Sequence, residues 1–208
     1  MRLTPHTPPA SVYRPGGRYD VRFLLWLIRM NTIFPTADAE ALTATILQKL
    51  GELGETLATA ESCTGGAIAH AIARIPGASG AFRGSVVAYS PDVKRHLLGV
   101  PDLYLDDIGI VSRETAMAMA AGVSHALDAD WALSTTGYAG PAGGDARYPV
   151  GTVCLAIYAR RHPQCAQTVT AHFVGNRAQC IHSATQYALQ MLKNTLSLLN
   201  CNNQTQFS

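Results

Sequence analysis

The chain has 208 residues and a mass of 22.1 kDa, which is typical of a single domain. Because 48% of the residues are hydrophobic and only 14% are charged, the composition excludes a globally disordered chain. The net charge of +2 and the pI near 8.3 argue against a nucleic-acid-binding protein, for which a domain pI above about 9 and clustered basic residues are typical.

The first 38 residues show no helical or strand periodicity, and we expect a poorly structured N-terminal extension over residues 1–38. The apolar run over residues 23–28 follows several arginines, as in a signal peptide, but no small-residue cleavage site comes after it. The run is also far shorter than the stretch of about 20 residues that crosses a bilayer. We therefore favour a poorly structured extension over a signal peptide, with Met30 as an alternative start site. We expect a cytoplasmic protein without a membrane partner.

From residue 39 onward, helix and strand patterns alternate, with apolar residues at helical spacing between short apolar runs. The expected elements are a helix up to Leu53, a strand over 56–60, a helix over 67–75, a strand over 85–89, a helix from Pro91 to Leu98, a helix that begins after Ser112 and a strand over 131–136. Helices between buried strands predict an α/β fold.

The last part of the domain reads differently, because strand patterns over 150–158 and 167–173 follow each other as in a hairpin. A final helix is expected over 177–199, before a polar tail over 200–208. The hairpin makes the predicted sheet mixed, so we expect a three-layer α/β/α sandwich over residues 39–199.

Five cysteines form an odd number without a CxxC pair, which favours reduced thiols over a disulfide framework or a zinc ribbon. The seven histidines lack HxxxH or HExxH spacing, so we expect no metal site. The cysteines are Cys63, Cys154, Cys165, Cys180 and Cys201.

The segment 61–66, ESCTGG, lies between a predicted buried strand and a helix. In an open α/β sheet ligands bind beyond the carboxyl ends of strands, and N–H groups at a helix N-terminus favour an anion. Ser62 is thus a candidate nucleophile, although Ser62 and Thr64 could instead simply cap the helix. Cys63 is a rival nucleophile, but no histidine partner stands nearby in the sequence, so a buried thiol is the better interpretation.

Two further segments can contribute to the same site. Residues 137–149 form a loop with four glycines in its first eight residues, and such long loops are usually functional. Tyr89 and Lys94 follow another predicted strand, and a desolvated lysine can take the proton of a serine. A solvated Lys94 is the alternative; without a Ser-His-Asp candidate, a Ser–Lys pair is the leading nucleophilic arrangement.

These motifs, together with PVGTV at 149–153, occur in the order and spacing of a known family. From about Ala39 to Leu199 the chain resembles the CinA C-terminal domain family, whose characterised members are nicotinamide-nucleotide amidases, and it is similar to the stand-alone form. The resemblance implies hydrolysis of the carboxamide of nicotinamide mononucleotide (NMN) to nicotinate mononucleotide and ammonia.

Site residues are carried over from the family motif by motif. The resemblance implies Ser62 as nucleophile, Lys94 as its base and Tyr89 as the third catalytic group, without a cofactor. Substrate-binding residues implied for the oxyanion, phosphate and ribose are Thr64, Gly65, Gly66, Thr136, Gly137, Gly140, Gly143, Gly144 and Arg177. We expect a small-molecule substrate, no nucleic-acid partner and a homo-oligomer.

The sequence departs from the family pattern at three places. Pro91 stands where asparagine is common and could shift the helix that carries Lys94. Tyr138 puts a bulky ring into the second loop, and Asn176 replaces the usual aspartate before Arg177. A nucleotide-binding paralogue with impaired catalysis is therefore the alternative function.

Overall fold

The computed structural model describes residues 13–14, 18–19 and 39–203. The chain divides into two compact units, Met1–Ala37 and Asp38–Ser208. In the first unit, β1 (Tyr13–Arg14) and β2 (Arg18–Tyr19) pair as a short antiparallel ladder. The apolar run 23–28 and Met30 lie outside the described residues.

The second unit is built on a five-stranded sheet in the order β4-β3-β5-β6-β7. Its strands are β3 (Leu57–Glu61), β4 (Phe82–Val87), β5 (Trp131–Gly137), β6 (Thr152–Ala159) and β7 (Gln167–His172). β3 runs parallel to both β4 and β5, whereas β6 and β7 continue the sheet antiparallel. The predicted mixed sheet and terminal hairpin are confirmed.

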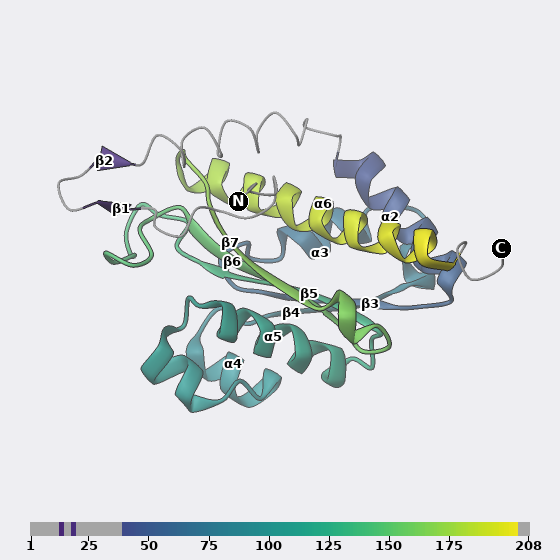
Figure 1. The fold of residues 1–208 in the computed structure, drawn as a ribbon, viewed down its shortest axis with the longest axis horizontal. Helices are drawn as coiled ribbons and strands as arrows, with labels where there is room; N and C mark the ends of the chain where they lie inside the picture. Colours follow the sequence, from purple (N-terminus) through teal and green to yellow (C-terminus); the bar gives the residue numbers. More distant parts are fainter. Residues whose placement is uncertain (1–12, 15–17, 20–38, 204–208) are drawn as a thin grey trace. The chain divides into compact units, whose positions relative to one another are not determined.

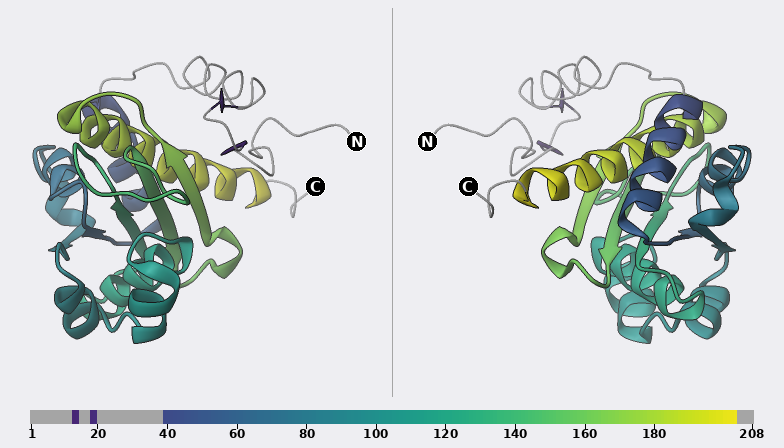
Figure 2. Two further views of the ribbon diagram at one scale, coloured as in Figure 1. Left: turned by 90° about the vertical axis from the view of Figure 1, so that its left-hand side faces the viewer. Right: turned by 90° about the vertical axis from the view of Figure 1, so that its right-hand side faces the viewer.

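Helices cover both faces of this sheet (Figures 1 and 2). One face carries α2 (Ala39–Leu53), α3 (Ala67–Ala73) and α6 (Arg177–Asn203), and the other carries α4 (Pro91–Leu98) and α5 (Arg113–Ala126). The predicted three-layer sandwich is thus confirmed. Within the described ranges, no helix is long and apolar enough to cross a membrane.

The two faces of the sheet differ in side-chain size because successive strand residues point to opposite sides. Toward α2, α3 and α6 the sheet presents large buried residues, among them Trp131, Leu133, Leu155 and Ile157. Toward α4 and α5 it presents small ones, among them Ala58, Ala60, Ala132 and Ala156. The small face lets α5 lie close to the sheet. The α4–α5 contact is also close, since a Cβ at Gly122 would lie 2.0 Å from the Leu98 carbonyl oxygen.

Several element boundaries differ from the prediction. β4 begins at Phe82 and ends at Val87, so Tyr89 lies beyond the strand rather than in it. α6 continues through Asn203 into the predicted tail, and 204–208 lie outside the described residues. A π-helix, η2 (Leu103–Gly109), had no counterpart in the prediction. Four cysteines, Cys63, Cys154, Cys165 and Cys180, carry free thiols, and the side chain of Cys201 is outside the described set.

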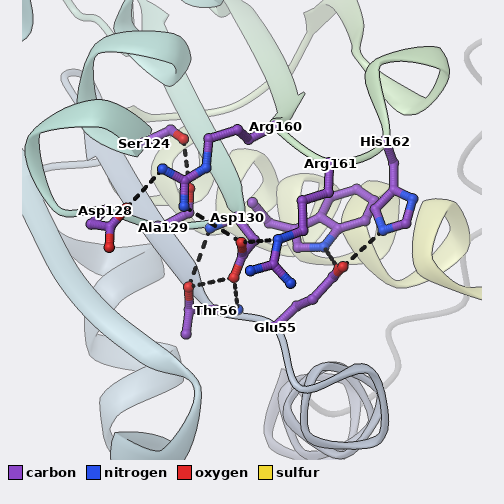
Figure 3. A network of polar contacts seen from close by, with 10 residues as sticks. Glu55, Thr56, Ser124, Asp128, Ala129, Asp130, Arg160, Arg161 and His162 are labelled. Atoms are coloured by element: carbon purple, nitrogen blue, oxygen red, sulfur yellow. Dashed lines mark hydrogen bonds and ion pairs between the residues drawn. The ribbon is translucent and has the colours of Figure 1, made fainter.

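A polar network joins the amino ends of β3 and β5 to the end of β6 (Figure 3). The Asp130 carboxylate accepts hydrogen bonds from the N–H and the hydroxyl of Thr56, both at 2.9 Å, and lies 2.9 Å from Arg161 Nε. Next to it, Glu55 accepts from the Trp131 indole and lies 2.9 Å from His162 Nε2. The network ties three strands together at the edge of the sheet where they meet.

Asp130→Asn is expected to lower the free energy of unfolding at pH 7 by about 2–3 kcal/mol, because it removes a buried charge partner of two arginines. Burial raises the pKa of the Asp130 carboxyl, but the Thr56 donors and Arg161 outweigh it and leave the pKa lowered. A lowered pKa stabilises the fold above the unfolded value near 4, and this contribution is lost as the pH falls through the folded pKa. Urea unfolding at pH 7 and pH 3 measures both effects.

The matched control is Asp128→Asn, since Asp128 pairs with Arg160 at the surface and its side chain is 78% exposed. Asparagine tolerates the left-handed backbone of this residue (φ 48°), so a change within about 0.5 kcal/mol is expected. Equal losses of unfolding free energy in both variants would show that the burial of Asp130 does not increase its contribution to stability.

Candidate active site

A cavity of about 210 Å³ lies where β3 and β5 end, between the predicted loops. Seven of the predicted site residues line it: Ser62, Tyr89, Lys94, Thr136, Gly137, Gly140 and Arg177. The carboxyl ends of two parallel neighbouring strands thus bring Ser62 and Gly137 to one cavity although they lie far apart in the sequence, as expected for an open α/β sheet.

Ser62 directly follows β3 and is held in a tight turn. Its N–H donates to the Thr135 carbonyl of β5 at 2.9 Å, and its own carbonyl accepts from the Gly65 N–H at 3.1 Å. The Ser62 side chain makes no cap for α3; the Glu61 carboxylate accepts from the N–H groups of Gly66, Ile68 and Ala69 instead. The hydroxyl of Ser62 is therefore left available to the cavity.

Lys94 comes from α4 and is only 1% exposed. Its Nζ lies 3.1 Å from Ser62 Oγ and donates to the carbonyl oxygens of Ala88 at 2.7 Å and Tyr89 at 3.5 Å. No carboxylate in the described part of the chain forms an ion pair with it. Burial lowers the pKa of Lys94 from 10.5 to about 8. About a tenth of this amine is therefore neutral at pH 7, far more than for an ordinary lysine, and a general base must be neutral to accept a proton.

Pro91 does not move Lys94 away from Ser62, although the sequence suggested that it could shift the helix. Pro91 occupies the first turn of α4, where its missing N–H costs nothing. The Ser90 side chain caps the helix by accepting from the Val93 N–H at 3.3 Å. Lys94 consequently lies against Ser62 in spite of the departure from the family pattern.

Cys63 also lines the cavity, but burial raises the pKa of its thiol to about 12. A thiol with such a pKa stays protonated at neutral pH and is a poor nucleophile. Of the two adjacent side chains, Ser62 is the one that forms a hydrogen bond with Lys94.

The second loop and α6 form the other wall of the cavity. Arg177, the first residue of α6, donates from Nη1 to the Gly140 carbonyl and from Nη2 to the Tyr89 hydroxyl, both at 2.9 Å. Asn176 accepts from the Gln179 N–H at 3.0 Å and so performs the capping expected of an aspartate there. Tyr89 is 60% exposed, so its hydroxyl lies at the rim with Arg177 and forms no hydrogen bond with Ser62 or Lys94.

Gly137 and Thr136 fix where this loop leaves the sheet. A Cβ at Gly137 would lie 2.5 Å from the Thr152 carbonyl oxygen, so this position needs glycine. The Thr136 hydroxyl donates to the Ile110 carbonyl at 2.6 Å and attaches β5 to the segment after η2.

Five predicted binding residues lie outside the cavity lining: Thr64, Gly65, Gly66, Gly143 and Gly144. The hydroxyl of Thr64 is taken by Glu61 at 2.7 Å and Thr135 at 2.7 Å. The N–H groups of Gly65 and Gly66 are engaged within the turn. By contrast, the N–H groups of Cys63 and Thr64 donate to no other residue in the described ranges.

The prediction missed Glu61, Ile110 and Val111. Ile110 and Val111 line the cavity from the end of η2, a segment without an interpretable sequence pattern. Glu61 is part of the segment ESCTGG, but the sequence does not suggest it as a helix cap because serine and threonine usually have that role. Its isolation as a single carboxylate directly before a candidate nucleophile was the available signal.

Comparison with known proteins shows which family the chain is similar to. The model of the CinA C-terminal domain matches residues 39–196. The chain is 43% identical over 159 residues to a CinA-like protein of Myxococcus xanthus (strain DK1622), which covers 76% of this chain and 37% of the relative. A CinA-like protein of Synechococcus sp. (strain CC9902) is 50% identical over 123 residues, 59% of this chain and 29% of the relative. The chain thus spans roughly a third of the length of these curated relatives.

Solved structures match more than three quarters of the chain. The competence damage-inducible protein A from Klebsiella pneumoniae subsp. pneumoniae MGH 78578 has a TM-score of 0.74 at 34% identity, covering 77% of this chain and 98% of that one. The competence/damage inducible protein CihA from Agrobacterium tumefaciens has a TM-score of 0.70 at 39% identity, covering 78% and 97%. With the family match over 39–196, these similarities show that the chain belongs to the CinA C-terminal domain family.

Proposed function

We propose that the protein is an amidohydrolase that converts NMN to nicotinate mononucleotide and ammonia, with Ser62 as nucleophile and Lys94 as base. The observation that carries the proposal is the buried Lys94 Nζ, 3.1 Å from Ser62 Oγ and without an acidic partner among the described residues. A structural lysine would normally be exposed or paired with a carboxylate.

The three partners of Lys94 Nζ indicate the direction of proton transfer. The Ala88 and Tyr89 carbonyl oxygens can only accept, so a neutral amine gives them its two N–H groups. Its lone pair is then directed at the Ser62 hydroxyl, which donates to it. This is the arrangement from which a serine proton is removed.

The reaction follows in two stages. Lys94 takes the Ser62 proton as Oγ attacks the carboxamide carbon; the tetrahedral adduct then breaks its C–N bond, and protonated Lys94 returns the proton to the leaving ammonia. Water attacks the resulting ester with Lys94 again as base, which releases the nicotinate carboxylate and restores Ser62. One water is consumed for each ammonia formed, and no redox change occurs.

The developing oxyanion needs N–H donors that are not already engaged. We assign this role to the N–H group of Cys63, because Cys63 lines the cavity and this N–H donates to no other residue among those described, whereas the N–H groups of Gly65 and Gly66 are taken within the turn. The oxyanion site inferred from the motif thus moves toward the start of the turn.

The phosphate of the substrate is assigned to Arg177. Its guanidinium donates to Gly140 and Tyr89 and has further N–H donors for a phosphate at the rim. This places the phosphate at the open end and the carboxamide beside Ser62. A phosphorylated substrate does not cross an apolar bilayer unaided, so we propose that the enzyme acts in the cytoplasm.

Ammonia release from NMN and from nicotinamide riboside tests the function. Turnover of NMN is expected, with a KM for the riboside at least about tenfold higher because Arg177 then lacks its anion. NMN binding by calorimetry without any ammonia would instead support the impaired paralogue, and equal KM values would contradict the assignment of Arg177.

Tyr89→Phe is expected to raise the KM for NMN about fivefold with little change in kcat, because an exposed hydrogen bond of about 1 kcal/mol to Arg177 is lost. Steady-state kinetics measure the two constants separately. Tyr158→Phe, near His125 and outside the cavity lining, is the control and should change neither. A hundredfold fall in kcat would instead support Tyr89 as the third catalytic group.

A further inference from the structure

A second buried charged group lies beside the nucleophile and has no role in the proposed chemistry. Glu61 is the last residue of β3, is fully buried and does not line the cavity. It cannot touch a substrate in the cavity, so it is not a catalytic residue. Burying a carboxylate is costly unless its oxygens are satisfied, which makes its partners informative.

Every partner of Glu61 is a donor. Oε2 accepts from the Thr64 hydroxyl at 2.7 Å and from the N–H groups of Gly66 and Ile68 at 3.0 and 3.1 Å. Oε1 accepts from the Ala69 N–H at 2.7 Å, with Thr59 Oγ1 at 3.4 Å. A carboxylate has two oxygens that can accept in this way, whereas an amide has only one.

These contacts close the chain into a loop around the nucleophile. Ser62 and Cys63 lie between Glu61 and Thr64, which are joined to each other by the 2.7 Å hydrogen bond. Thr64 is also linked to Thr135 of β5, the same residue whose carbonyl receives the Ser62 N–H. The turn is therefore tied to α3 through Glu61 and to β5 through Thr135.

We propose that Glu61 is a positioning residue, a buried carboxylate that holds the Ser62 turn so that Oγ stays against Lys94 and the N–H group of Cys63 stays free. This inference rests on the proposed role of Ser62 as nucleophile, but not on the identity of the amide. The carboxylate acts through the turn and makes no contact with the reacting atoms.

Glu61→Gln is the direct test, because glutamine has the same size but must place an NH₂ group against N–H or hydroxyl donors. The probe is an aryl sulfonyl fluoride, which forms an O–S bond with Ser62 Oγ and releases fluoride while Lys94 takes the serine proton. We expect the rate of labelling, followed by mass spectrometry, to fall at least about 30-fold, since small misplacements of a nucleophile are costly. For NMN, kcat should fall by a similar factor while KM changes less than about threefold.

Glu55→Gln is the matched control. Glu55 is also a buried carboxylate, 6% exposed, but it belongs to the polar network at the opposite ends of the strands (Figure 3). It should lower thermal stability without slowing the labelling of Ser62. Thr64→Val, which deletes only the hydroxyl between Glu61 and Thr135, is a milder second variant and should slow labelling about fivefold.

The outcomes separate the two proposals. Labelling of Ser62 in the wild-type chain without ammonia from NMN would reject the substrate and leave the positioning role supported by a slow Glu61→Gln. The positioning role would be overturned if Glu61→Gln and Thr64→Val were both labelled at the wild-type rate. It would also be overturned if Glu55→Gln slowed labelling as much as Glu61→Gln does. Absence of any wild-type labelling at pH 9 would overturn both proposals.

Discussion

Replacing Ser62 by alanine is expected to reduce ammonia release from NMN by about 10⁴-fold or more, because the covalent route disappears with the nucleophile. The fold should persist, since the turn is held by backbone hydrogen bonds of Ser62 and by Glu61, not by the Ser62 hydroxyl. An ammonia assay with a thermal unfolding curve on the same sample measures both properties.

Ser85→Ala is the matched control for this loss. Ser85 lies on the neighbouring strand β4, and its buried Oγ has no hydrogen-bond partner within the described ranges. Its removal should leave turnover and stability nearly unchanged. Full turnover by Ser62→Ala, together with loss of turnover in Cys63→Ala, would identify the thiol as nucleophile in spite of its raised pKa.

The layers of the fold follow from local sequence patterns. The helical spacing of apolar residues distinguishes α2 and α5 from the short apolar runs of the strands. The short link between β6 and β7 predicts their hairpin. The π-helix Leu103–Gly109 could not be predicted in this way, because its geometry depends on tertiary hydrogen bonds. One of these is donated by the Thr115 hydroxyl of α5 to the Gly109 carbonyl at 3.0 Å.

The chemistry of the site was more predictable than its binding surface. Ser62 and Lys94 could be paired from the sequence because both follow strands whose carboxyl ends meet at one edge of a parallel sheet. The oxyanion donors could not be assigned, because the sequence does not reveal which N–H groups of a glycine-rich turn are already engaged. Glu61 decides this point, and its reach to Ala69 across the turn is a tertiary feature.

Lys94→Met should abolish turnover while leaving the protein folded. The gap between a pKa of about 8 and the usual 10.5 corresponds to about 3 kcal/mol, a cost of keeping the charged amine buried that methionine does not carry. The variant leaves the Ala88 carbonyl without a donor, which costs about 1–3 kcal/mol and offsets that gain. Lys49→Met on α2 is the control for loss of a lysine, and should keep full activity.

The pH dependence of turnover and of stability must agree if Lys94 is the base. As its pKa is about 8, the neutral fraction rises from about a tenth at pH 7 to about nine-tenths at pH 9, and kcat/KM should rise about tenfold. Because the folded pKa is lowered, the folded chain binds fewer protons than the unfolded chain between pH 8 and 10.5. Stability should therefore gain from this group as the pH rises through that window, and Lys94→Met should lack the gain. A flat activity profile from pH 6 to 9 would assign the proton transfer to another group, because a base cannot act without its titration appearing in the rate.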